Sequence, residues 1–265
     1  MFGSSSQKAV KRYRPACGNP RFGSRCCLCK LPHDDSCKSR PSVDACATSK
    51  VAEEMKVFVA GKPLDVETEV VRKYVKNHSK TATEYDLKAG MYDEVSEGLI
   101  RSTRVFSSRI SSAECEWFVE RALDAPWASL KPGDCLTAAD PFEIGGLYDK
   151  GLDLWNHFSF DRRVGIADAK ISKVLHAMRP SFFPVLDSRV RKHYQNQALS
   201  VAQQMADLRS SKYAYWAAIR LDLIASDKAL SEVRSELQSD KNGLIIEWAN
   251  HVSDVRLHDV LVWSK

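Results

Sequence analysis

The residues of this chain best suited to chemistry lie in one run, residues 164–194, where an acid stands among basic side chains. Asp187 follows the apolar stretch 182–186 and precedes residues with helical spacing. A carboxylate at a helix N-terminus is held in place by backbone N–H groups and by the positive end of the helix dipole. A carboxylate fixed in this way can take part in chemistry, or it can serve only as a helix cap.

Basic residues bracket this acid and are candidates for phosphate contacts. They are Arg179, Arg189, Arg191 and Lys192. Gly165 lies in a tight turn upstream, where exposed backbone amides either bind a phosphate or only connect two helices. The alternative for the four basic side chains is a solvated face, because residues 51–265 are slightly acidic overall.

The same run resembles the helix-hairpin-helix DNA glycosylase superfamily, in which a hydrophobic-Gly-hydrophobic-Gly hairpin precedes a helix and an apolar-Pro-Val-Asp segment. The resemblance implies that Asp187 is the catalytic carboxylate, which stabilises positive charge on the sugar or activates water after the base is flipped out. It also implies that Lys170 is an amine nucleophile. Lys173 is the second choice, because the spacing of Lys170 to the acid differs from the family's by a residue or two.

Several positions depart from the pattern of that superfamily. The hairpin matches at Gly165, but Ala167 replaces the second glycine and Ile171 replaces a small alanine. No cysteine follows Cys135, so the iron–sulfur signature of some members is absent and no cofactor is expected. The altered hairpin favours, as an alternative, a DNA- or protein-binding module that has the fold without the chemistry.

A second resemblance is to an uncharacterised bacterial family of unknown function, over about residues 80–265. The shared elements are Ser108–Ser111, Pro126–Trp127, Ala139–Pro141, Gly146–Asp149, Arg179–Val190 and Asp259–Trp263. This resemblance implies kinship and no particular activity.

Outside the central run, Arg104 and Arg109 are candidates for a phosphate or carboxylate contact, although most surface arginines have no such role. The histidines of the helical part lack the spacing of a catalytic metal site, and Gly145–Gly146 lacks the context of a nucleotide-binding loop. Most aromatic residues lie at helical spacing on apolar faces and are expected in the core.

Helical periodicity dominates the chain from residue 66 onward, and a short apolar alternation near 55–61 predicts one short strand. The predicted helices cover 66–78, 112–125, 142–158, 168–178, 188–208, 211–225, 226–239, 243–252 and 256–263. In these helices Leu123 is expected to face the core, Pro141 to mark a helix start, Gly151 to be a weak point and Asp227 to be a cap. The sequence therefore predicts an all-α, multi-helix fold of the helix-hairpin-helix glycosylase type.

The first 50 residues differ in composition from the rest of the chain. They hold ten Lys and Arg against three Asp, a net charge of +7, so the remaining residues carry −2 of the total +5. Residues 1–50 are predicted to be a basic, cysteine-rich, disordered tail before a helical domain at 51–265. A weaker alternative is a zinc site, because two thiolates at C-x-x-C spacing can face one tetrahedral ion. Its candidate ligands are Cys26, Cys29, Cys37 and Cys46.

Composition also limits the class of protein. The opening residues lack the apolar run of a signal peptide, and no stretch of the chain is apolar enough to span a membrane. We expect a soluble, cytoplasmic protein with DNA as a possible partner and no membrane contact. The leading hypothesis is base excision with Asp187 as the carboxylate, and the alternative is a non-enzymatic binding module.

Overall fold

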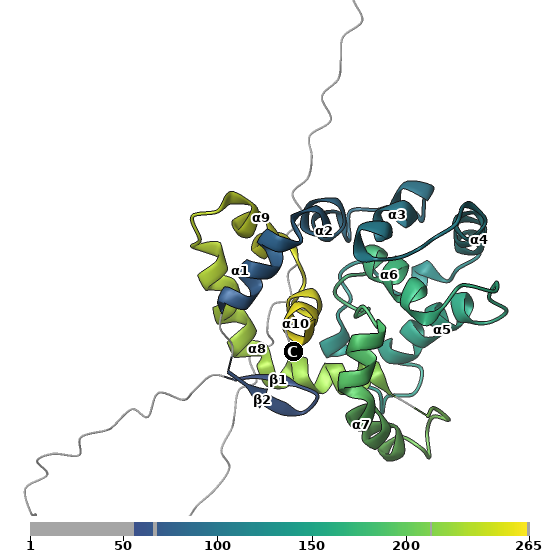
Figure 1. Ribbon diagram of the computed structural model, residues 1–265. Coiled ribbons are helices and arrows are strands. Elements are labelled where there is room, and N and C mark those ends of the chain that lie inside the picture. Colours follow the sequence, from purple (N-terminus) through teal and green to yellow (C-terminus); the bar gives the residue numbers. More distant parts are fainter. Residues whose placement is uncertain (1–55, 66–67, 213, 264–265) are drawn as a thin grey trace, which may run out of the picture. The chain divides into compact units, whose positions relative to one another are not determined.

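Helices make up most of the part of the chain that is described by the computed structural model, which comprises residues 56–65, 68–212 and 214–263 (Figure 1). The helices are α1 Thr68–Asn77, α2 Ser79–Glu84, α3 Glu97–Ser102, α4 Ser112–Leu123, α5 Leu147–Ser159, α6 Asp168–Met178, α7 Ser188–Gln204, α8 Tyr215–Gln238, α9 Gly243–His251 and α10 Asp254–Trp263. The strands β1 Val57–Val59 and β2 Lys62–Leu64 form an antiparallel hairpin in which Val57 pairs with Leu64. The predicted all-α fold with one short strand region is confirmed.

Two predictions lie outside the described residues, namely the basic tail at 1–50 and its candidate zinc ligands Cys26, Cys29, Cys37 and Cys46. None of the described helices is both long enough and apolar enough to span a membrane.

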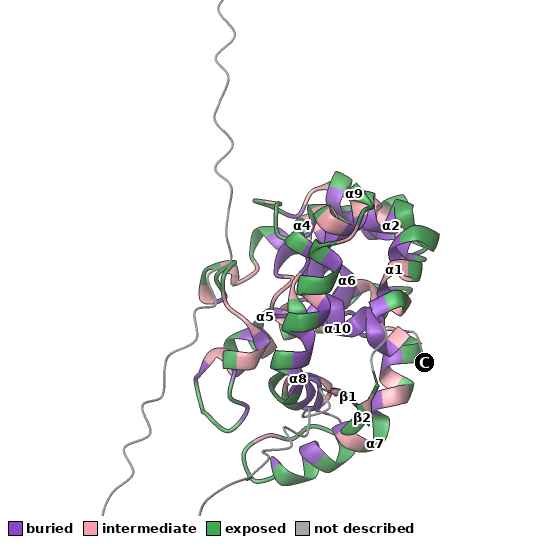
Figure 2. Cartoon of the chain, turned by 90° about the vertical axis from the view of Figure 1, so that its left-hand side faces the viewer, coloured by how far each residue is buried: buried purple, intermediate pink, exposed green. Residues whose placement is uncertain are grey.

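Helix α10 is the centre of the helical unit. Every residue from Val255 to Val262 is buried, and α1, α7 and α8 all contact this helix. Figure 1 shows α1 and α9 on one side of α10 and α3 to α6 on the other. Figure 2 shows buried residues along α6, α8 and α10. A helix that is buried on all sides must be apolar or internally paired around its whole circumference.

The structure has one long helix, α8 Tyr215–Gln238, where two helices were predicted at 211–225 and 226–239. Asp227 is an exposed residue inside α8, so its predicted role as a helix cap is wrong. Nothing in the segment breaks the helix, since it holds neither Gly nor Pro. Ser226 is buried and its hydroxyl accepts a hydrogen bond of 2.8 Å from the Phe58 backbone N–H, which fastens β1 to α8.

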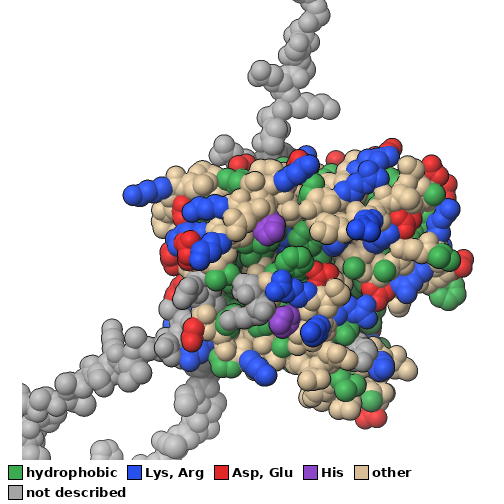
Figure 3. Space-filling view, in the orientation of Figure 1, with side chains coloured by type: hydrophobic (Ala, Val, Ile, Leu, Met, Phe, Trp, Pro, Cys, Tyr) green, Lys and Arg blue, Asp and Glu red, His purple; other side chains and the backbone are tan. Residues whose placement is uncertain are grey.

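The surface of the unit mixes charges of both signs. On the face shown in Figure 3, Lys and Arg side chains alternate with acidic and apolar ones, and no unbroken basic patch crosses that face. Leu123, which was expected in the core, is 81% exposed and lies at the last residue of α4, where the helix leaves the core.

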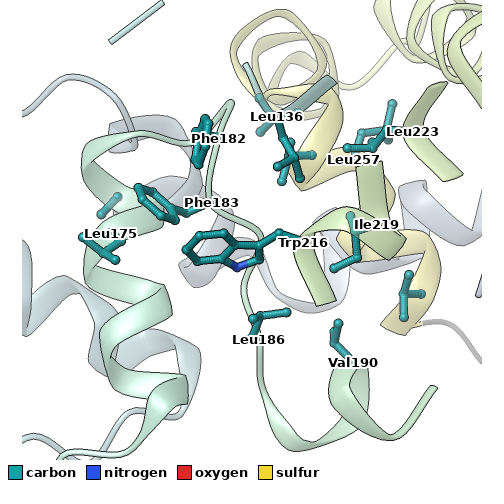
Figure 4. Close-up of a cluster of buried hydrophobic side chains, with 14 of the residues drawn as sticks. Leu136, Leu175, Phe182, Phe183, Leu186, Val190, Trp216, Ile219, Leu223 and Leu257 are labelled. Atoms are coloured by element: carbon teal, nitrogen blue, oxygen red, sulfur yellow. The ribbon is translucent and has the colours of Figure 1, made fainter. Parts of the chain in front are cut away.

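A cluster of buried apolar side chains surrounds Trp216 of α8 (Figure 4). The predicted buried connector between α6 and α7 is confirmed, because Phe182, Phe183 and Leu186 are all buried. The Phe183 and Trp216 ring centroids lie 5.2 Å apart in an edge-on arrangement, which is favourable for aromatic pairs. This connector therefore fixes where α7, and with it Asp187, begins.

Helix α5 begins later than predicted. Asp140–Pro141 does not start it; the Asp140 carboxylate accepts the Phe142 N–H in a turn, and Gly145 has a φ of +72°. The helix starts at Leu147 and continues through Gly151 without a break. Gly151 is buried against Phe182, so its small size serves packing.

We expect Gly151→Ala to destabilise the protein even though alanine favours helix by about 1 kcal/mol. A Cβ at this position would lie 2.2 Å from the Cε1 atom of the Phe182 ring, which a close-packed core cannot absorb. Overpacking of this kind costs about 1–3 kcal/mol, which urea unfolding will measure as a lower free energy of unfolding.

The matched control is Gly243→Ala at the start of α9, where an added Cβ would meet nothing within 4 Å. That variant should be as stable as the wild type or slightly more stable. Equal stability of the two alanine variants would contradict the packing role of Gly151.

Candidate anion-binding site

A hairpin at residues 160–167, between α5 and α6, contains a run of exposed residues, 160–165. Ile166 is buried and its N–H donates to the Arg163 carbonyl at 3.1 Å, while Val164 beside it is 97% exposed. Gly165 has a φ of +96°, a conformation that side chains with a Cβ rarely adopt. The buried Ile166 therefore fixes the loop to the core, and the positive φ of Gly165 lets the chain turn so that Val164 lies in solvent.

Gly165 also permits a close contact with α4. A Cβ on Gly165 would lie 2.8 Å from the Glu114 Oε1 atom, so the carboxylate reaches the hairpin only because glycine is present. The position therefore requires glycine for both its backbone conformation and its neighbour.

Glu114 links the start of α4 to α6. Its Oε2 accepts the Ser111 N–H at 2.8 Å and its N–H donates to the Ser111 hydroxyl at 3.2 Å, which is a capping box. Its Oε1 accepts a hydrogen bond of 2.6 Å from the Lys170 Nζ. Burial raises the pKa of Glu114, but the hydrogen bonds from Lys170 and Ser111 outweigh burial and the pKa is lowered on balance.

A pocket of about 670 Å³ lies between this part of α4 and the hairpin. It is lined by Arg104, Ser108, Arg109, Ile110, Ser111, Glu114, Arg163, Val164 and Lys170. Four of these side chains are cations and one is an anion. The pocket is therefore a concentration of positive charge in a helical unit that is slightly acidic as a whole.

Two polar groups of the pocket have contrasting surroundings. The Arg104 guanidinium donates to the Ile110 carbonyl at 2.6 Å, which fixes its position. Ser108 is 6% exposed and its Oγ is buried with no hydrogen-bond partner among the described residues. A buried hydroxyl without a partner costs free energy that a bound acceptor can recover.

Asp187 caps α7, as its sequence position indicates. Its Oδ1 accepts the N–H groups of Arg189 and Val190, both at 2.9 Å, and the side chain is partly exposed. Asp187 does not line the pocket, whereas Lys170 does. The glycosylase resemblance implies that Asp187 and Lys170 act together. In the structure Lys170 forms an ion pair with Glu114, whereas Asp187 caps α7.

Lys173 is closer in character to an activated amine than Lys170 is. It is buried, its Nζ donates to the Phe106 carbonyl at 2.5 Å and lies 4.9 Å from the centroid of the Phe106 ring. Burial lowers the pKa of Lys173 to about 8, although the negative charge of Asp187 partly opposes this shift. A lysine with such a pKa has a large neutral fraction near pH 8.

The four basic residues around Asp187 fall into different environments. Arg179 is buried, donates to the Leu130 and Met178 carbonyls and stacks over Trp127, so its guanidinium does not face solvent. Burial lowers the pKa of Arg179. We therefore assign Arg179 a structural role in place of the predicted phosphate contact.

The other three basic residues lie on α7. Arg189 and Lys192 are exposed, and the Arg189 guanidinium lies 5.7 Å from the Trp263 ring centroid. Arg191 binds the Asp168 carboxylate at 2.9 Å, and the same carboxylate binds Arg162 of the hairpin at 2.5 Å. Asp168 thus ties the first turns of α7 to the hairpin.

Sequence reasoning identified part of the pocket. It selected Lys170, Arg104 and Arg109 separately, without placing them together. It missed Ser108, Glu114 and Arg163 as lining residues. The described residues contain no group of three or more His, Cys, Asp or Glu side chains that could hold a metal ion.

We expect Glu114→Gln to lower the free energy of unfolding at pH 7 by about 1–3 kcal/mol, because charge-assisted hydrogen bonds to Lys170 and Ser111 are lost. The folded-state pKa of Glu114 is lowered, so its stabilisation is complete above the ordinary value of 4.5 and disappears as the pH falls through the folded-state pKa. The difference from the wild type should therefore shrink in acid, as urea unfolding at pH 7 and pH 3.5 will measure.

Glu116→Gln is the matched control, because Glu116 is an exposed acid on the same helix. It should change stability little at either pH. A Glu114→Gln variant whose stability loss is the same at both pH values would contradict the role of the ionised carboxylate.

Comparison with known proteins finds a family model that matches residues 136–265, and the matched family has no known activity. No curated protein and no solved structure matches the chain. The matched segment includes the hairpin, Lys170 and Asp187, and it begins later than the expected residue 80, after the α4 side of the pocket. Residues 136–265 match the model of a Family of unknown function (DUF6308).

Proposed function

We propose that the protein binds DNA through backbone phosphate contacts at the hairpin and the adjoining pocket. The observation that supports this proposal is the convergence of Arg104, Arg109, Arg163 and Lys170 on one pocket, beside a hairpin whose residues 160–165 are exposed. Arginine, lysine and exposed backbone N–H groups are the usual ligands of DNA phosphates. The exposed arginines Arg109 and Arg163 are the residues best placed to reach a strand that passes over the pocket.

The proposed contact is local. The face in Figure 3 mixes both signs of charge, and residues 51–265 carry a net charge of −2. Few phosphates would therefore be neutralised, and the dependence of binding on salt should be modest. With about three phosphate contacts, the slope of log K against log salt is about −2.7 for duplex DNA.

The test is the salt dependence of DNA binding, measured by fluorescence anisotropy with a labelled duplex. Arg109→Ala combined with Arg163→Ala should weaken binding and reduce the magnitude of the salt slope by about 2, since two phosphate contacts are lost. The effect should be similar for duplexes of unrelated sequence, because phosphate contacts do not read bases.

The control is Lys73→Ala combined with Lys228→Ala. These substitutions also remove two positive charges, but from exposed lysines of α1 and α8 that do not line the pocket. If the two double variants lose the same affinity, the binding depends on net charge and the pocket has no special role. Absence of salt-dependent binding by the wild type would disprove the proposal.

A second candidate function is base excision, favoured by burial of Lys173, which lowers its pKa to about 8 even though the charge of Asp187 acts in the opposite direction. In this reaction Asp187 would stabilise positive charge on the sugar as the base leaves. The Lys173 amine would then attack the sugar aldehyde, lose water and form an imine, which borohydride reduces to a stable amine.

Asp187→Asn separates the carboxylate from its capping role, because asparagine caps helices as well as aspartate does. The variant should fold as the wild type does and lose about 100-fold or more of base release from duplexes with damaged bases. Borohydride should cross-link the wild type to abasic-site DNA with a yield that rises as the pH passes about 8.

The cross-link should disappear in Lys173→Arg and persist in Lys170→Arg. Base release by Asp187→Asn at the wild-type rate, or no release by the wild type from any lesion, would end this second candidate.

A further inference from the structure

We infer that the pocket beside the hairpin is a site for a phosphate monoester, a terminal phosphate with two negative charges. The inference deepens the proposed function, and its DNA form rests on that function. The ligand is defined by its chemistry and has two possible sources, a phosphorylated strand end or a small phosphorylated molecule. Four features of the pocket point to this ligand: its positive charge, the buried Ser108 hydroxyl, the mixture of hydrogen-bonded and exposed cations, and a described lining without aromatic side chains.

The charge of the pocket exceeds what one backbone phosphate needs. Its four cations face one carboxylate, Glu114, which is paired with Lys170. Three positive charges therefore remain uncompensated by the lining. A phosphodiester carries one negative charge, whereas a phosphate monoester carries about −1.5 to −2 at pH 7 and presents three acceptor oxygens.

The buried hydroxyl of Ser108 supplies a donor that the protein itself does not use. Its Oγ has no hydrogen-bond partner among the described residues, although the side chain lines the pocket and is 94% buried. Buried hydroxyls without partners are rare in folded proteins and are accounted for by a water, an ion or a ligand. A phosphate oxygen bound in the pocket is an acceptor that this hydroxyl could use.

Two cations of the pocket are held by hydrogen bonds within the protein, and two others are exposed. Arg104 is held by the Ile110 carbonyl, and Lys170 is held by Glu114. Arg109 and Arg163 are exposed. Fixed cations reduce the entropy that binding must remove, and an exposed arginine can add a bidentate contact to two phosphate oxygens.

The lining favours recognition of the phosphate alone. None of the described residues that line the pocket is aromatic, and its two large apolar side chains are Ile110 and Val164. A nucleobase would find no ring to stack on, and such stacking is the main source of affinity for single bases. The rest of the ligand therefore contributes little to binding affinity, and the phosphate group supplies most of it.

The experiment uses the full chain and two 20-base-pair duplexes that differ only in a 5′-phosphate or 5′-hydroxyl at the unlabelled end. The wild type should bind the 5′-phosphate duplex about 10-fold more tightly, because the terminal phosphate adds charge-assisted hydrogen bonds with the pocket. Ser108→Ala should reduce this preference several-fold. Ser112→Ala, an exposed serine of α4 outside the pocket lining, should keep the preference.

Inorganic phosphate provides the second arm, with thermal unfolding as the readout. It should raise the melting temperature of the wild type more than sulfate at equal ionic strength, and it should not do so for Arg109→Ala combined with Arg163→Ala. Ser108→Ala shortens a buried side chain and is expected to fold, which its melting temperature will verify.

The outcomes separate the two proposals. DNA binding without any preference for the 5′-phosphate, together with no effect of inorganic phosphate, overturns the inference and leaves the proposed function standing. Stabilisation by inorganic phosphate without DNA binding supports the site, assigns its ligand to small phosphorylated molecules and overturns the DNA proposal. Failure of both arms overturns both.

Discussion

The buried ion pair between Asp86 and Arg256 is the interaction on which the arrangement of the helices depends. Both residues are fully enclosed; the Arg256 Nε donates to the Asp86 Oδ1 at 2.9 Å, and the Trp248 indole donates to the other carboxylate oxygen at 2.9 Å. Burial opposes the charged form of Arg256, but Asp86 and its neighbours outweigh burial and raise the pKa of Arg256. Removing one partner from such a pair costs about 3–5 kcal/mol, because the other charge is left buried and unpaired. The pair joins α10 and α9 to the turn after α2, so residues far apart in the sequence share one core.

The same ion pair positions the candidate site through Phe106. The Arg256 guanidinium lies 4.5 Å from the Phe106 ring centroid, and the Phe106 carbonyl accepts the Lys173 Nζ. Residues 108–111 begin two positions after Phe106 and form one wall of the pocket, while Lys173 lies one turn after Lys170 on α6. The two walls of the pocket are therefore fixed relative to each other by contacts in the core, and the Glu114–Lys170 pair closes them at the surface. Preorganisation of this kind is what a site for a small charged group requires.

The sequence allowed prediction of features that depend on neighbouring residues. The all-α class, the buried connector 182–186 and the capping position of Asp187 follow from helical periodicity and cap chemistry, and the structure has each of them. The errors have long-range causes. Ser226 sits inside α8 because it binds β1, and Gly151 is required by Phe182; neither partner is close in sequence. The pocket escaped prediction for the same reason, since Glu114 and Lys170 are separated by 56 residues.

The convergence of four cations on one pocket is electrostatically unfavourable, and the ion pair of Lys170 with Glu114 offsets it only in part. Like charges repel even near a surface, and only Glu114 offsets them among the lining residues. Two arginines elsewhere in this protein are paired with carboxylates, Arg256 with Asp86 and Arg209 with Asp149. Around the pocket, by contrast, one carboxylate faces four cations, and the buried Ser108 hydroxyl has no hydrogen-bond partner among the described residues. An anion with several acceptor oxygens would both neutralise the excess positive charge and accept a hydrogen bond from the Ser108 hydroxyl. The same reasoning disfavours a broad duplex-binding face, because the positive charge is concentrated in one recess while the helical unit as a whole is slightly acidic.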